Sequence, residues 1–337
     1  MIYGNINVAD FIPKDHQGDV SSILQSIIDT NPNRTLYFPD GEYLLDRPIL
    51  TPAHPEKSVD LQLSNYAIFR PTEAFDSDEA MIRLGATHPA NDIETVGSTY
   101  SLTGGILDGM GKAKGVSIDG GRETVIKQVS IKNTTVGLHI KFGPNNGSSD
   151  ADITNVNIVG NGTKDAIGVL VEGFDNTFTN MRIANVYQGV VIHSAGNILR
   201  NIHPLFTLPF EDFEGSCGFY DDRGTNWYNV CYSDNFCYGY RESNDIHSIY
   251  NSCYCMWYSP KGEKHTAFKA DGLFRSIITD FKIGFKEGQT NNVILDVGKE
   301  GGPGVFEKII APLHLISART HEEYLRGGIF NKVKDLF

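Results

Sequence analysis

A short motif recurs along most of this chain: a small residue, usually glycine, begins an alternating five-residue strand. The copies start at Gly115, Gly137, Gly168, Gly189, Gly218, Gly239 and, in weaker form, Thr266 and Asn292. Successive starts are 22, 31, 21, 29, 21, 27 and 26 residues apart. Self-similarity at such a spacing is the sequence signature of a repeat architecture, so the repeat constrains the fold more than any other feature.

Each repeat has room for two or three short strands and turn residues, but not for an amphipathic helix. This excludes leucine-rich and helical solenoids and predicts an all-β, right-handed parallel β-helix. In such a coil each strand pairs with its equivalent one turn later, about 4.8 Å away. Residues at equal phase therefore form columns along the coil.

A second motif, a hydrophobic residue, any residue and then asparagine, follows the first at nearly constant phase. Its asparagines are Asn155, Asn180, Asn201, Asn229 and Asn251, which follow their glycines by 18, 12, 12, 11 and 12 residues. Asparagines in one inward column can pass amide hydrogen bonds from rung to rung. The alternative is that they are ordinary turn residues.

Length and charge narrow the function classes. The 337 residues, 40% of them hydrophobic, can bury a long core, and the chain has no apolar run of membrane-spanning length. The first residues lack the basic and apolar segments of an export signal. A net charge of −12 argues against nucleic-acid binding and, unless a basic patch or a bound cation offsets it, against a polyanionic substrate. We expect a cytoplasmic or phage-virion protein without a membrane partner.

All 5 cysteines lie between positions 217 and 255. Their number is odd, and no spacing matches a paired CxxC metal site. Buried, reduced thiols inside the coil and a reducing compartment are the expectation. We expect no metal site and no cofactor.

The chain is expected to divide into an N-terminal cap with the first strands (1–50), the β-helix (51–300) and a C-terminal cap or docking segment (301–337). From Asp19, apolar residues recur at helical spacing up to Asn31, which predicts a short helix covering the open first rung. Residues 35–45, TLYFPDGEYLL, read as two strands around a Pro-Asp-Gly turn. His314 and His321 in the last segment are expected to be packing or surface residues.

The helix followed by YFPDGEYLL, together with GGILDGMG at 104–111, resembles the pectate-lyase-like superfamily of right-handed parallel β-helix proteins. That superfamily includes polysaccharide lyases, polygalacturonase-like glycoside hydrolases and phage tailspikes. The resemblance covers roughly residues 10 to 300 and implies a carbohydrate-active protein. The Asn-Thr-Asp and Gly-His-Gly signatures of polygalacturonases are absent, so the resemblance does not supply the reaction.

Within each repeat the first and third residues after the glycine are mostly apolar and should point inward, so the second and fourth should point outward. The fourth positions are Asp119, Lys141, Glu172, His193, Asp222 and Ser243. The second positions are Ser117, His139, Leu170, Val191, Tyr220 and Arg241. These two columns form a candidate functional stripe, although a solvated ladder of surface charges would have the same pattern.

Glu172 and Asp222 are two rungs apart, so their backbones should lie about 9 to 10 Å from each other, a spacing that suits an inverting glycosidase. One carboxyl would protonate the leaving oxygen and the other would activate water, with His193 between them. Lys141 and Arg241 would bind hydroxyls or a uronate carboxylate, and Tyr220 would stack on a sugar.

An alternative arrangement uses Asp221, Asp222 and Arg223. In a regular strand Asp221 faces inward and needs a buried partner, whereas a bulge would turn both aspartates outward as a catalytic pair.

Two insertions could border the stripe: residues 142–152 after Lys141 and residues 204–216 before the strand of Asp222. The second carries Glu211 and Asp212 among phenylalanines. Such a loop could hold a sugar, bind a cation, pack on a neighbouring subunit or simply be solvated.

The favoured function is therefore a hydrolase that cleaves glycosidic bonds in an oligo- or polysaccharide. A polysaccharide lyase is the nearest alternative, with Lys141 or Arg241 taking a proton beside a uronate and a cation such as calcium stabilising the enolate. A third is a tailspike-like homotrimer that binds glycans without cutting them.

Overall fold

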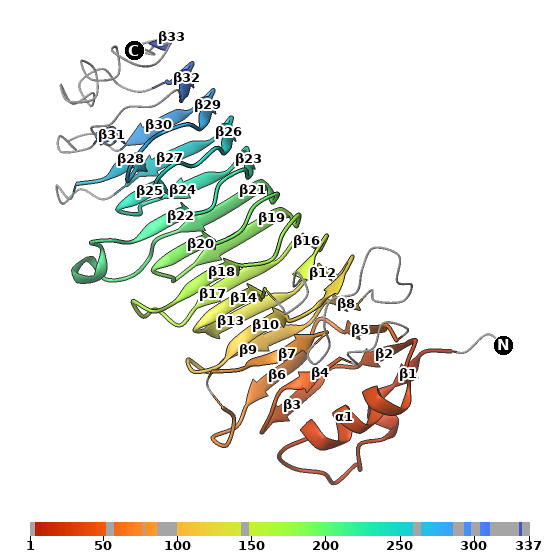
Figure 1. Cartoon of the computed structure of the whole chain (residues 1–337). Coiled ribbons are helices and arrows are strands. Elements are labelled where there is room, and N and C mark those ends of the chain that lie inside the picture. The colour runs from red at the N-terminus through yellow and green to blue at the C-terminus, as the bar shows by residue number, and fades with distance from the viewer. Residues whose placement is uncertain are drawn as a thin grey trace. The chain divides into compact units, whose positions relative to one another are not determined.

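The computed structural model describes residues 4–51, 57–76, 78–85, 100–142, 148–258, 264–285, 293–297, 304–310 and 330–331. In these residues nearly every strand pairs in parallel with a strand one repeat away, and the chain coils as a right-handed parallel β-helix (Figure 1). The predicted fold class is confirmed. No described helix combines the length and the apolar character needed to cross a membrane.

The β-helix consists of two compact units. The first comprises Met1–Asn161 and Gly168–Thr177, and the second comprises Gly162–Ile167 and Phe178–Phe337. The sequence does not predict this division, because the repeat runs through it.

The first unit begins with the predicted capping helix, α1 (Ser21–Thr30), which follows the short strand β1 (Ile6–Asn7) and the 3-10 turn η1 (Val8–Asp10). Asp19 accepts a hydrogen bond from the Ser21 backbone N–H at 2.8 Å and so satisfies one free donor at the start of the helix. Leu24, Ile27 and Ile28 are buried. The Gln25 amide bonds both backbone groups of Leu50, which ties the helix to β4.

Three ladders of strands build each unit, and in the first unit the ladder that carries the predicted stripe is β4 (Ile49–Leu50), β7 (Ala80–Leu84), β10 (Lys114–Ile118), β14 (Val136–Ile140) and β18 (Ile167–Val171). The second ladder is β1, β2 (Arg34–Phe38), β5 (Val59–Leu63), β8 (Tyr100–Thr103), β12 (Val125–Lys127) and β16 (Asp152–Thr154). The third is β3 (Gly41–Leu45), β6 (Ala67–Pro71), β9 (Ile106–Asp108), β13 (Ser130–Thr134) and β17 (Asn157–Gly160). A small pair, β11 (Gly121–Arg122) and β15 (Ser148–Ser149), lies outside these ladders.

In the second unit the stripe ladder consists of β20 (Gln188–Ile192), β22 (Cys217–Asp221), β25 (Tyr238–Glu242), β28 (Thr266–Ala270) and β31 (Val293–Val297). The long strands β19 (Thr177–Ala184) and β21 (Ile198–Leu205) begin both other ladders. From β21, one of these two ladders runs through β23 (Trp227–Asn229), β26 (Ile249–Asn251), β29 (Ile277–Thr279), β32 (Val305–Glu307) and β33 (Phe330–Asn331). The other continues through β24 (Tyr232–Asp234), β27 (Tyr254–Trp257) and β30 (Lys282–Phe285).

The predicted register holds for the strong repeats and slips at the weak ones. Val116 pairs with Leu138 and Phe219 with Tyr240, as equal phase requires. Arg241, however, pairs with Lys269, so Ala267 rather than Thr266 occupies the glycine position of its repeat. The glycine position is one of close approach between rungs, since a Cβ at Gly239 would meet Ala267 O at 2.8 Å, and in the next repeat the small residue at this position is alanine. Asn292 lies outside the described residues.

The asparagine column lies elsewhere than predicted. Asn155, Asn180 and Asn201 have φ of 54° to 56°, because they turn the corner in the left-handed conformation that asparagine tolerates. Their side chains face outward, although Asn201 does donate to Asn180 across one rung at 2.8 Å. The inward ladder is made by Asn197 and Asn226, and it continues through Ser248 and Ser276.

Aromatic rings fill the core of the second unit. Phe219 stacks on Tyr240 at 4.8 Å and Tyr228 on Tyr250 at 4.5 Å, each pair joining successive rungs. The cysteines are all buried and free, as predicted.

Some expectations fall outside the described residues. These are the middle of the first insertion (143–147) and nearly all of the predicted C-terminal segment, including His314 and His321.

Candidate functional site

The predicted fourth-position column points outward on the stripe ladder of each unit, whereas in the second-position column Ser117 and Val191 are buried. Third-position residues such as Ile140 and Ile192 are fully buried, whereas the neighbouring fourth-position side chains are partly exposed. Alternation along the strands is the cause, because the apolar side chains occupy the interior. The stripe is therefore a real surface in each unit, and its chemistry differs between the two units.

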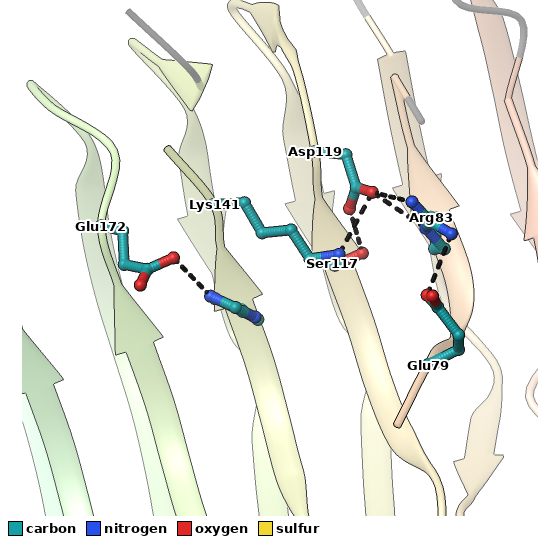
Figure 2. Close-up of polar contacts among 7 residues, drawn as sticks. Glu79, Arg83, Ser117, Asp119, Lys141 and Glu172 are labelled. Carbon is teal, nitrogen blue, oxygen red and sulfur yellow. Dashed lines mark hydrogen bonds and ion pairs between the residues drawn. The ribbon is translucent and has the colours of Figure 1, made fainter. Parts of the chain in front are cut away.

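In the first unit the stripe is a closed ion-pair network (Figure 2). Arg83 on β7 donates to Asp119 from Nε at 2.8 Å and pairs with Glu79 at 2.9 Å. Lys141 approaches the same Asp119 oxygen at 3.2 Å, and the Ser117 hydroxyl bonds the other oxygen. The Asp119 side chain is only 8% exposed. Lys141 is thus committed to a buried carboxylate, which argues for a structural role.

Glu172, next along this stripe, belongs to a separate pair. The Nε2 atom of His139 on β14 lies 2.8 Å from Glu172 Oε2. Burial lowers the pKa of His139, and the hydrogen bond to Glu172 opposes this shift only in part. His139 is therefore neutral near pH 7 and donates from Nε2, which holds a carboxylate that is 38% exposed.

In the second unit the stripe contains a histidine–aspartate pair. His193 Nδ1 lies 2.8 Å from Asp222 Oδ2 across one rung, and the two side chains are 38% and 28% exposed. Because Asp222 accepts a hydrogen bond from Nδ1–H, it orients the ring and leaves the other nitrogen, Nε2, for proton transfer. This is the arrangement that a general acid or base needs.

An aromatic and basic patch adjoins this pair. The Tyr220 ring stands edge-on to His193, with centroids 6.4 Å apart. The Arg241 guanidinium lies 5.5 Å from the Tyr220 centroid and donates from Nε to Asp271 at 2.7 Å. Lys269 pairs with the same Asp271 at 3.2 Å, so two cations share one carboxylate. Burial, and then the charge of Asp222, raise the pKa of Tyr220, which keeps its hydroxyl protonated.

Asp221 does not join the site, so the outward-bulge alternative is wrong. Ile192, Asp221 and Glu242 pair in regular register, and Asp221 is 1% exposed. It accepts hydrogen bonds from Asn226, from the Tyr228 hydroxyl at 3.0 Å, from the Ser248 hydroxyl at 2.7 Å and from the Gly224 backbone N–H at 2.9 Å. These buried donors satisfy the inward carboxylate that alternation demands. Arg223 is exposed, and only its backbone N–H reaches Asp221.

The acidic loop is not brought to the histidine–aspartate pair. Asp212, in the 3-10 turn η2 (Phe210–Asp212), bonds Lys164 at 3.3 Å, and Glu211 is exposed. Phe206 and Phe213 are buried against Phe236 and His265. The loop borders the start of β22, whereas Asp222 follows its end. Its predicted contact with substrate therefore lacks support from this geometry.

Arg83, Lys269 and Asp271 were not predicted from the sequence. Arg83 lies in a repeat without a leading glycine, and Lys269 and Asp271 were assigned the wrong phase by the slip at Thr266. Aligning Ala267 with Gly239 would have placed both in the outward columns. Within the described ranges, no group of three or more His, Cys, Asp or Glu side chains gathers as a metal site would.

The predicted acid–base partners, Glu172 and Asp222, belong to different compact units. Their joint action stays a prediction. Each is bonded to a histidine within its own unit.

The fold defines a class, the right-handed parallel β-helix proteins, and solved structures of that class are similar to this chain. No protein-family model matches the chain, and no curated protein matches it. A tailspike mutant of E. coli bacteriophage HK620 in complex with a hexasaccharide matches 98% of this chain and 65% of its own, with a TM-score of 0.64 at 12% identity.

Two other matches differ in kind. A surface protein and adhesin of Streptococcus pneumoniae, PfbA, matches 97% of this chain and 96% of its own, with a TM-score of 0.55 at 13% identity. The tailspike gp49 of Acinetobacter baumannii bacteriophage Fri1, a capsular polysaccharide depolymerase, matches 100% of this chain with a TM-score of 0.55 at 12% identity. The chain spans 61% of that tailspike and 61% of the Geobacillus virus E2 protein ORF18. At these identities the likeness is one of fold.

Proposed function

We propose that this protein binds an oligo- or polysaccharide along the outer stripe and cleaves its glycosidic bonds there. The observation that carries the proposal is the His193–Asp222 pair. Both side chains are partly exposed, and Tyr220 and Arg241 flank them. An oriented proton-transfer group beside an aromatic ring and a guanidinium suits a hydroxylated substrate. The hexasaccharide in one similar tailspike and the depolymerase activity named for another support the choice of ligand.

Hydrolysis is the first candidate reaction. It needs an acid that protonates the leaving oxygen and a base that takes a proton from the attacking water. Glu172 and Asp222 are the carboxylates predicted for these roles, and each is hydrogen-bonded to a histidine of its own unit, His139 and His193.

Elimination is the second candidate, because the second unit holds its three requirements in one patch. His193 Nε2 would take the proton beside a uronate carboxylate, and Arg241 would neutralise the developing enolate. Tyr220, kept protonated, would donate to the leaving oxygen. In this scheme Asp222 is a positioning residue. A divalent cation for this reaction and a homotrimer remain predictions, tested by EDTA and by sedimentation of the purified chain.

The experiment is a screen of purified neutral and uronate-containing polysaccharides, with reducing ends and ultraviolet absorbance both recorded. Hydrolysis releases reducing ends alone, whereas elimination also creates an unsaturated, absorbing product. Glu172→Gln is expected to abolish hydrolysis and to spare elimination. His193→Ala is expected to lower elimination about 10²- to 10⁴-fold.

His247→Ala is the matched control, because His247 also lies near an aspartate, Asp245 at 3.8 Å, but on an exposed turn. It should keep full turnover. Binding without any product would identify a non-catalytic glycan-binding protein. Full turnover in both Glu172→Gln and His193→Ala would refute the assignment of the site.

A further inference from the structure

A second cluster of aromatic and acidic side chains lies on a different ladder of the second unit. His203 on β21, Tyr232 on β24 and Tyr254 on β27 occupy one outward column, one per rung. The His203 and Tyr232 rings stack at 4.1 Å with 13° between their planes, and the Tyr232 and Tyr254 centroids are 4.7 Å apart. All three are only partly buried, and none belongs to the stripe.

A buried carboxylate lies beside this column, two residues after Tyr232 on the same face of β24. Asp234 is 5% exposed, and its Oδ2 accepts a hydrogen bond from the Tyr232 hydroxyl at 3.2 Å. His203 Nε2 is 3.7 Å away, beyond hydrogen-bonding distance, and Asp234 Oδ1 has no partner among the described residues. A buried carboxylate with so few donors depends on the Tyr232 hydroxyl as a hydrogen-bond donor. Because the proton of Tyr232 is directed to Asp234, the oxygen of Tyr232 keeps its lone pairs free to accept a hydrogen bond from a third group.

The open side of the column is at Tyr258. Its side chain is 48% exposed, and its hydroxyl lies 3.4 Å from that of Tyr232. Its backbone N–H is bonded by the Asn235 side chain, which fixes the place where the ring leaves the strand. Tyr258 thus offers a ring face and a hydroxyl beside the polarised Tyr232 hydroxyl. Lys282, 5.5 Å from the Tyr254 ring, closes the other end of the column.

We propose that Tyr232, Tyr258 and Asp234 form a second saccharide-binding site, which holds a polysaccharide without cleaving it. A sugar ring packs on Tyr258 and donates one hydroxyl to Tyr232, whose own proton goes to Asp234. The buried negative charge repels phosphate and carboxylate groups, so the site selects a neutral, hydroxyl-rich sugar. The choice of a saccharide rests on the proposed function, whereas the location of the site does not.

The test compares polymer binding with turnover of a short fragment. The probe is the polysaccharide from the screen that the wild-type protein binds most tightly, together with the shortest fragment of it that is still cleaved. Tyr258→Ala is expected to weaken polymer binding about tenfold, and Tyr232→Phe and Asp234→Asn about fivefold. Turnover of the fragment is expected to stay unchanged in all three variants.

Trp227→Ala is the matched control, because Trp227 is an outward aromatic of the same unit, 36% exposed, on the neighbouring ladder. It should bind the polymer as the wild type does. Tyr232→Phe keeps the ring stack, so unchanged thermal unfolding of this variant separates lost binding from lost folding.

Equal polymer affinity in Tyr258→Ala, Tyr232→Phe and wild type would overturn the second site and leave the proposed function intact. Loss of fragment turnover in these variants would also overturn it, because the cluster would then belong to the cleaving site. If the wild-type protein binds no polysaccharide in the screen, both proposals fail.

Discussion

Asp119 in the first unit and Asp222 in the second occupy the same position of the repeat, four residues after the glycine, yet their surroundings differ. Asp119 accepts bonds from Arg83, Lys141 and Ser117 and is almost inaccessible. Asp222 accepts from the side chain of His193 and stays partly exposed. The same column can therefore tie rungs together or present a reactive group, and the residue one rung away decides which.

The largest expected effect comes from changing each aspartate to asparagine. Asp222→Asn should lower turnover about 10²- to 10⁴-fold, because an amide no longer orients His193 for proton transfer, and should hardly change stability. Asp119→Asn should keep turnover and lower the free energy of unfolding by about 3 kcal/mol, because two cations lose a buried partner. Steady-state kinetics and urea unfolding measure both effects. Equal losses of turnover in the two variants would contradict the assignment of a structural role to Asp119 and a catalytic role to Asp222.

A second comparison concerns the inward column. In the first unit its third positions are aliphatic, as at Ile118 and Ile140, whereas the second unit buries Asp221 and Glu242 on successive rungs. Complete burial, together with the nearby charge of Asp221, raises the pKa of Glu242 from 4.5 to about 8. The folded state therefore holds a proton that the unfolded state releases above pH 4.5.

From this shift we predict that the free energy of unfolding falls as pH rises from 4.5 to 8, by about 1.4 kcal/mol per pH unit from this group. The contribution of Glu242 is fully present below pH 4.5 and lost above pH 8. Glu242→Gln should remove this slope, because an amide does not titrate. Urea unfolding of both proteins at several pH values measures the difference, in which the titrations of groups distant from Glu242 cancel. Parallel curves would mean that Glu242 is ionised in the folded state.

The smallest effect is expected from Lys269, which shares Asp271 with Arg241. Lys269→Met should raise KM for a uronate-containing substrate about threefold and leave KM for a neutral one unchanged, because a partly exposed charge contributes little. Lys264→Met, an exposed lysine of the same repeat, is the control. An equal rise in KM for both substrates would show that the patch of Tyr220, Arg241 and Lys269 does not discriminate between charged and neutral substrates.

Much of the fold could be predicted because a β-helix repeats its local rules. Alternation placed Val116 and Phe219 inside and His193 and Asp222 outside, since the period of a strand is two residues. The same rule placed Asp221 inside. The start of one repeat was assigned to Thr266 instead of Ala267, because a small residue other than glycine begins that repeat. As a result Lys269 and Asp271 were not assigned to the stripe.

The prediction that the asparagines form an inward column failed for a different reason. Their constant phase was detected, but phase alone does not tell a corner from an inward position. Asn180 and Asn201 turn corners, and Asn197 and Asn226, which follow no detected motif, line the interior.

What the amino-acid sequence determined by itself is the coil and the direction of each side chain, because small residues and alternating apolar residues act within a few positions of the chain. Which side chains become partners was decided only by the tertiary structure. His193 meets Asp222 and His139 meets Glu172 across 29 and 33 residues. Such partnerships depend on the length and turns of each rung, and these set the register only once the rungs are stacked.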